Sequence, residues 1–381
     1  MMMNSFSKSS TETLCKQVAS LLVVGFEGDT TDNHYIQSLC RLPQPGGLIA
    51  FDLVCDDANI SLKKPKNIVN HKQLLQLNSG LRSLFPESLI SIDSEGGVDW
   101  TESENGDPIR YGVNRLKVDA GFPATLCAYQ IGELYRHGKL DAVKQHCYEI
   151  AEVLSDLKFN CVYAPVVDIH NDDCPIIGAM HRSYSSSYDE LIACAKIFIA
   201  TCQELGIQTC LKHYPGHGSA LGDTHLGQVD ITQQWSENEL EPFHALANQC
   251  GMVMMSHVIH RGIDDQPVSL SKTWIDRLRA SGFDGVIISD DIQMAAATQT
   301  LSASSVESLD KLVLRAFLAG NDMVIIGGQL SPLPISAYQQ LVESLSEAVA
   351  SKQWPIDSML ASVERVERYK QHLTQANQLK S

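Results

Sequence analysis

Residues 252–290 read MVMMSHVIHRGIDDQPVSLSKTWIDRLRASGFDGVIISD and contain one complete strand–helix–strand unit. Met252–His257 and Gly285–Asp290 are short apolar runs of the kind that forms strands buried on both faces of a parallel sheet. Between them, the apolar residues of Trp274–Ser281 recur at the 3.6-residue spacing of an amphipathic helix. The stretch therefore predicts part of an α/β protein with a parallel sheet.

The same alternation runs along the whole chain. Six further apolar runs predict strands at Leu21–Phe26, Gly47–Phe51, Ser88–Asp93, Asn160–Val167, Gln208–His213 and Asp322–Ile326. Helical spacing appears in Tyr188–Leu205, Asn238–Asn248 and Ser305–Ala319. Eight strands that alternate with helices predict a closed TIM (β/α)8 barrel, although doubly wound open sheets share this alternation.

Polar residues favour the barrel over the open sheet, because they gather at or just after the C-terminal ends of the predicted strands. They are Asp93, Glu95, Asp168, His170, Lys212, His213, His257, Asp290 and Asp291. In a TIM barrel this face carries the active site. The polar stretch Thr101–Gly121 is expected to form a loop over that site.

A single domain is expected to span residues 1–381. After the eighth strand, helical patterns remain only in Ser336–Glu347 and Ile356–Gln375. We therefore place the barrel core at about residues 14–350 and a C-terminal helical segment at about residues 351–381.

Composition excludes several classes of function. The 381 residues carry 29 Lys and Arg against 45 Asp and Glu, and the net charge of −16 repels nucleic-acid phosphates and anionic lipid. No apolar run approaches the 18 or more residues of a membrane span. The N-terminus lacks the basic region of a signal peptide, and the eleven cysteines contain no CxxC pair. We expect a cytoplasmic protein with reduced thiols and no nucleic-acid or membrane partner.

The densest polar cluster reads KHYPGHG at residues 212–218 and is followed by DTH at residues 223–225. Its proline and glycines disfavour a helix and predict an irregular binding loop. His213 and His217 have the spacing of a helical zinc pair, but the Pro-Gly between them removes that geometry, so we expect no metal site. Asp223 can orient the imidazole of His225 for general acid–base chemistry, or the two can be a solvated loop pair.

Asp290 follows almost directly on a buried apolar run, where a charge must be paired or used. The alternative is structural, because an aspartate is also a favoured N-cap for a helix that is expected to begin near Ile292. With Asp291 beside it, one aspartate can serve in each role.

Together, KHYPGHG, DTH and FDGVIISDDIQM (283–294) resemble the signatures of glycoside hydrolase family 3, in its bacterial β-N-acetylglucosaminidase branch. Supporting blocks occur in the same order along residues 14–350. They include LLVVGFEG (21–28), IDSEGG (92–97), YAPVVDI (163–169) and HRSY (181–184). So many ordered blocks are far more specific than any one motif.

The resemblance implies a retaining, exo-acting enzyme on a TIM barrel that releases terminal β-linked N-acetylglucosamine, as this branch commonly does from peptidoglycan fragments. Asp290 matches the nucleophile, and His225 assisted by Asp223 matches an unusual acid/base. The sugar-binding residues of the family correspond to Asp93, Arg182, Lys212 and His213. No cofactor is implied.

One block departs from the family pattern. After EGG the family normally continues with one or two arginines, whereas this chain reads VDWT at residues 98–101. A lost guanidinium removes a fork of hydrogen-bond donors, which Arg110 or Arg115 can replace. Two other functions therefore stay open: a glycoside phosphorylase, because a histidine acid/base repels phosphate less than a carboxylate, and a catalytically silent sugar-binding barrel.

Overall fold

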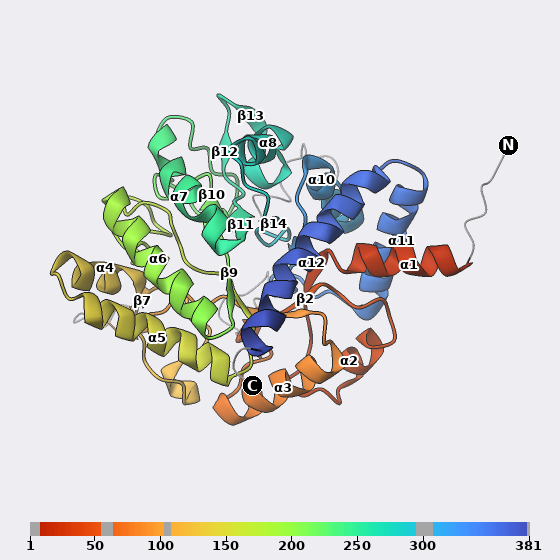
Figure 1. The fold of residues 1–381 in the computed structure, drawn as a ribbon, viewed down its shortest axis with the longest axis horizontal. Coiled ribbons are helices and arrows are strands. Elements are labelled where there is room, and N and C mark those ends of the chain that lie inside the picture. The colour runs from red at the N-terminus through yellow and green to blue at the C-terminus, as the bar shows by residue number, and fades with distance from the viewer. Residues whose placement is uncertain (1–7, 55–63, 103–107, 295–307, 379–381) are drawn as a thin grey trace.

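The computed structural model describes residues 8–54, 64–102, 108–294 and 308–378 (Figure 1). Each of the eight predicted runs contains a strand, and the fifth run contains two. The strands are β1 Leu22–Gly25, β2 Gly47–Ala50, β5 Leu89–Ile92, β8 Cys161–Val162, β9 Gln208–Thr209, β10 Leu211–Tyr214, β11 Met252–Met255, β14 Val286–Ser289 and β15 Val324–Ile326. The strand predictions are therefore confirmed, with shorter bounds.

These strands form two parallel sheets rather than the one continuous closed sheet that the sequence predicts. One sheet has the order β15-β1-β2-β5-β8-β9 and the other β10-β11-β14. The interruption lies where β8 ends early and the fifth run divides at Cys210, because Pro165 in the fourth run has no N–H to continue the ladder. Isolated parallel bridges, Val166 with Lys212 and Ile288 with Met323, lie at the two junctions.

Helices surround the strands in Figure 1. Those that match predicted segments are α6 Tyr188–Glu204, α7 Glu241–Cys250, α8 Lys272–Ala280, α10 Leu309–Ala319, α11 Ile335–Ala350 and α12 Ile356–Gln378. The remaining α-helices of the described ranges are α1 Lys8–Ala19, α2 His34–Leu39, α3 His71–Leu84, α4 Ala128–Arg136 and α5 Leu140–Asp156. Local chemistry sets several ends: Ser271 Oγ accepts the Trp274 N–H at the start of α8, and Gly251 ends α7 in the left-handed region.

Helix α12 covers the N-terminal ends of the strands. The Tyr369 hydroxyl donates to the Thr209 carbonyl in β9 at 2.9 Å, and Ser362 donates to Asp322 just before β15 at 2.9 Å. Since this end is covered, the C-terminal ends of the strands are left for the functional site.

Antiparallel hairpins follow three strands at that C-terminal end. They pair β3 Leu53–Val54 with β4 Lys64–Pro65, β6 Val98–Glu102 with β7 Pro108–Tyr111, and β12 Ile259–His260 with β13 Asp264–Pro267. The stretch expected to be a loop, Thr101–Gly121, thus contains β7 and the 3₁₀ helix η1 Val118–Ala120, and its residues 103–107 lie outside the described ranges. In the described parts of the chain, no helix is both long and apolar enough to cross a bilayer.

Candidate active site

One cavity at the C-terminal ends of the strands brings together all seven residues that the sequence singled out. It is lined by Asp93, Glu95, Val113, Arg115, Ile176, Met180, Arg182, Lys212, His213, His217, Asp223, Thr224, His225 and Asp290. These residues come from distant segments, which the strand ends place on the same face of the molecule.

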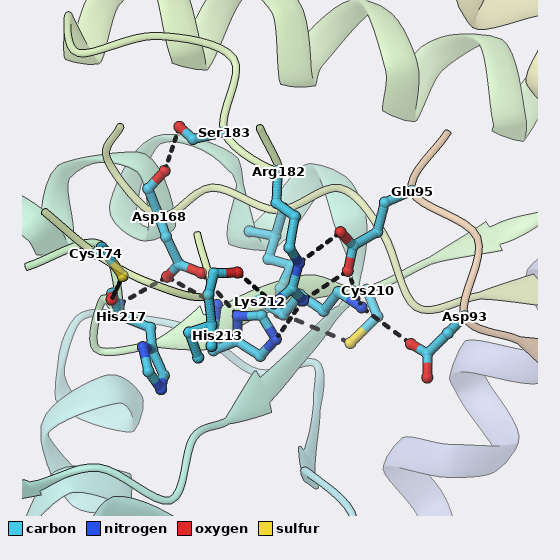
Figure 2. Close-up of polar contacts among 12 residues, drawn as sticks. Asp93, Glu95, Asp168, Cys174, Arg182, Ser183, Cys210, Lys212, His213 and His217 are labelled. Atoms are coloured by element: carbon cyan, nitrogen blue, oxygen red, sulfur yellow. Dashed lines mark hydrogen bonds and ion pairs between the residues drawn. The ribbon is translucent and has the colours of Figure 1, made fainter. Parts of the chain in front are cut away.

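A buried ion-pair network forms one wall of the cavity (Figure 2). Arg182 donates from Nε and from one terminal nitrogen to the two oxygens of Glu95, each at 2.8 Å. Lys212 Nζ lies 2.8 Å from Glu95 and 3.0 Å from Asp93. Burial by itself raises the pKa of Glu95, but the charges of Arg182 and Lys212 outweigh it and hold that pKa well below its usual range. The network therefore fixes two cations and two carboxylates in one arrangement.

Asp168 fixes the next part of the wall. Its carboxylate accepts the backbone N–H groups of His213 at 3.0 Å and His217 at 2.9 Å, and it lies 2.7 Å from His213 Nδ1. Burial opposes ionisation of Asp168, yet the neighbouring His213 keeps its pKa below the usual value. An ionised carboxylate only accepts, so Nδ1 carries the proton, and Nε2 of a neutral His213 is left as an acceptor beside Arg182 at 3.4 Å.

His217 is buried at the cavity wall, and neither ring nitrogen has a partner among the described residues. Burial, reinforced by His213, lowers its pKa to about 4, so the ring is neutral at neutral pH. The rings of His213 and His217 meet edge to face with centroids 5.9 Å apart. Within the described ranges, no group of three His, Cys, Asp or Glu side chains is placed to hold a metal ion.

Asp223 and His225 form a pair on the loop that follows KHYPGHG. Asp223 Oδ1 lies 2.8 Å from His225 Nδ1 and also accepts the His225 backbone N–H at 2.8 Å. Burial raises the pKa of Asp223, but the hydrogen bond and charge of His225 lower it further than burial raises it. The His225 side chain is 54% exposed, so it approaches the cavity from the solvent side.

Asp290 lies at the end of β14, where its backbone N–H donates to the Met255 carbonyl at 3.0 Å. Burial raises its pKa, but the imidazoles of His213, His257 and His225 together bring it below the usual value. Asp290 is therefore ionised at neutral pH in a cavity that also holds a histidine on its outer side.

Asp291 has a structural role, but not the expected one. Its carboxylate accepts the N–H groups of Gln293 and Gly327, each at 3.1 Å, and burial raises its pKa to about 6. Residues 292–294 form a turn, so the helix expected near Ile292 does not begin there, and residues 295–307 lie outside the described ranges.

The structure also shows which residues the sequence reasoning noticed without giving a role. Glu95 and Asp168 hold the sugar-binding candidates in place, and His257 bonds Ser269 at 2.7 Å and the Asp291 carbonyl at 2.9 Å. Their position at strand ends was the available signal. Of the two suggested replacement arginines, Arg115 lines the cavity, whereas the side chain of Arg110 lies outside the described residues.

The model of the Glycosyl hydrolase family 3 N terminal domain matches residues 13–369. The chain belongs to glycoside hydrolase family 3. It is similar to a β-hexosaminidase of Shewanella frigidimarina, with 32% identity over 67% of this chain and 69% of that protein. A β-hexosaminidase of Chromobacterium violaceum is 31% identical over 76% of this chain and 80% of its own length. The family and these relatives identify this family 3 protein as a glycoside hydrolase.

Solved structures share the fold of this family 3 enzyme. A fungal multi-domain β-N-acetylglucosaminidase of the family matches 94% of the chain with a TM-score of 0.76 and 26% identity. A β-N-acetylglucosaminidase from a Paenibacillus species matches 95% of it with a TM-score of 0.75 and 24% identity. The chain spans 39% of the first of these structures and 62% of the second.

Proposed function

We propose that this family 3 enzyme is a retaining, exo-acting β-N-acetylglucosaminidase. One observation carries the proposal: a single cavity is lined by an ionised aspartate, an Asp-His pair and a fixed set of polar groups suited to sugar hydroxyls. The relatives named as β-hexosaminidases support the choice of sugar. The proposed natural substrate is a peptidoglycan fragment that ends in β-linked N-acetylglucosamine, which follows from the resemblance to the bacterial branch of the family.

The first chemical step transfers the sugar to the protein. A carboxylate oxygen of Asp290 attacks the anomeric carbon and forms an ester as the bond to the leaving oxygen breaks. The imidazolium of His225, oriented through Nδ1 by Asp223, gives its proton to that oxygen. The protonated aglycone leaves and His225 becomes neutral.

The second step releases the sugar. Neutral His225 takes a proton from water, the water oxygen attacks the anomeric carbon, and the ester bond to Asp290 breaks. This restores the carboxylate of Asp290 and the imidazolium of His225. An ordinary retaining enzyme uses a second carboxylate for these proton transfers.

The sugar is proposed to bind against Lys212, Arg182, Asp93 and His213. Lys212 and Arg182 are fixed by Glu95, so their remaining donors are held ready and lose little freedom when a hydroxyl binds. His213 is held in the same way by Asp168.

We also propose that the two sheets act as one (β/α)8 barrel. The bridges Val166 with Lys212 and Ile288 with Met323 support this, since they connect the two sheets at both junctions. A cytoplasmic location is proposed as well. It is supported by the cysteines of the described ranges, which are free thiols and mostly buried.

The test measures hydrolysis of p-nitrophenyl N-acetyl-β-glucosaminide and of the matching β-glucoside, with and without phosphate. We expect the acetylated substrate to react at least roughly a hundredfold faster, because a site built around a polar substituent rejects an analogue that lacks it. A faster glucoside would overturn the assignment of the sugar. Phosphate-dependent release of a sugar phosphate would indicate a phosphorylase, and binding without turnover would indicate a silent sugar-binding protein.

A further inference from the structure

A second, smaller cavity adjoins the first beside Asp290. The two have volumes of about 60 and 110 Å³, and both are lined by Asp93, Arg115, His225 and Asp290. The smaller one also has an apolar wall that includes Phe51, Met294 and Leu330. A ligand whose reacting carbon lies at Asp290 therefore has room on both sides of that carbon.

The smaller cavity extends inward rather than toward solvent. Its floor is formed by strand residues with at most 2% exposure, Ile49, Met254 and Ile325. His225, which faces the leaving oxygen in the proposed mechanism, approaches from the exposed side. The aglycone thus departs outward, and the inner cavity receives a substituent of the bound ring itself.

Arg115 provides the hydrogen-bond donors at this place. Its side chain is 15% exposed, and the guanidinium lies 3.4 Å from Asp52, 3.9 Å from Asp93 and 5.2 Å above the ring of Phe51. Nε has no partner among the described residues. A guanidinium has five N–H donors, and these long contacts use few of them. The side chain is therefore held in place while most of its donors remain for an acceptor on a ligand.

We propose that this inner cavity is the subsite for the 2-acetamido group and that Arg115 donates to its carbonyl oxygen. The inference rests on the proposed function, which places the anomeric carbon at Asp290. Carbon 2 is bonded to that carbon, so its substituent lies next to the nucleophile. An acetamido group needs an apolar surface for its methyl and a donor for its carbonyl, and Phe51, Met294, Leu330 and Arg115 supply both.

The test compares kcat/KM for p-nitrophenyl N-acetyl-β-glucosaminide with kcat/KM for the β-glucoside in Arg115→Met. We expect the ratio to fall about 10- to 100-fold, because the glucoside never used the lost donors. The matched control is Lys117→Met. Lys117 Nζ pairs with the other oxygen of Asp52 at 2.9 Å but does not line either cavity, so its loss should leave the ratio within about threefold of wild type.

The outcomes separate the two proposals. If wild type prefers the acetylated substrate and Arg115→Met keeps that preference, the subsite assignment is wrong and the function stands. If wild type shows no such preference, the proposed function fails, and the subsite fails with it. Should Arg115→Met not fold, Arg115→Lys keeps a cation opposite Asp52 without the planar fork, and its ratio is expected to fall at least about threefold. An unchanged ratio in whichever variant folds overturns the assignment.

Discussion

At the scale of single residues, Asp290 carries the strongest expectation. Asp290→Asn should lower turnover by several orders of magnitude with the fold intact, because the attacking carboxylate is lost. The neighbouring Asp291→Asn is the matched control, since an amide oxygen can still accept the N–H groups of Gln293 and Gly327. Steady-state rates and thermal unfolding of both variants provide the check. An Asp290→Asn rate within about tenfold of wild type would assign the nucleophile elsewhere.

His225 should matter in proportion to how much the leaving group needs a proton. His225→Ala is expected to lose roughly 10²- to 10⁴-fold on substrates with poor leaving groups and less on activated aryl glycosides. Asp223→Ala should show the same pattern more weakly, since it acts through the histidine at 2.8 Å. The measurement is kcat/KM on an alkyl and an aryl N-acetylglucosaminide. Equal losses on both would mean that His225 only positions the sugar.

At the scale of elements, the KHYPGHG loop is anchored by groups outside the site. Trp235 Nε1 donates to the Pro215 carbonyl at 3.0 Å, and Ser219 Oγ donates to Glu239 in the 3₁₀ helix η2 Glu237–Leu240. A Cβ at Gly216 would lie 2.6 Å from Glu239 Oε2, so only glycine allows the loop to pack this closely. The anchor sets where the loop begins and leaves the Asp223–His225 pair nearer to solvent.

This anchor has a pH dependence. Burial raises the pKa of Glu239 from 4.5 to about 7, so the folded state holds this proton more tightly than the unfolded state. The stabilisation is present below about pH 4.5 and is lost as pH rises through about 7, at most about 3 kcal/mol. Glu239→Gln should remove this loss. Unfolding free energies at pH 5 and pH 8 test it, and parallel pH profiles for wild type and variant would contradict it.

The sequence predicted the elements unevenly, for physical reasons. Apolar runs of buried strands are visible in composition, so every one of the eight predicted runs contains a strand. The hairpin of β12 and β13 was missed, because its second strand, DDQP, has neither alternation nor β-branched residues. The turn at Ile292–Met294 was also missed, since Asp291 bonds Gly327, which is distant in sequence.

At the scale of the whole molecule, the site depends on contacts that no local pattern contains. The seven candidate residues could be named from motifs, and the strand ends explain why they share a cavity. The partners of these residues could not be named in the same way. Glu95 joins Arg182 across 87 positions and Asp168 joins His213 across 45, and such pairs exist only once the strands are assembled. The fate of the missing arginines likewise required the cavity walls, which place Arg115 beside Asp290.

The central claim is covalent catalysis on an N-acetylglucosaminide by Asp290. The most direct measurement is peptide mass spectrometry of His225→Ala after rapid acid quenching from a reaction with an activated aryl N-acetylglucosaminide. Without the base for the second step, the glycosyl-enzyme should accumulate, and one N-acetylglucosaminyl group should be found on the peptide that contains Asp290. The same group on a peptide without Asp290, or turnover of this substrate with no adduct in wild type or variant, would contradict the account.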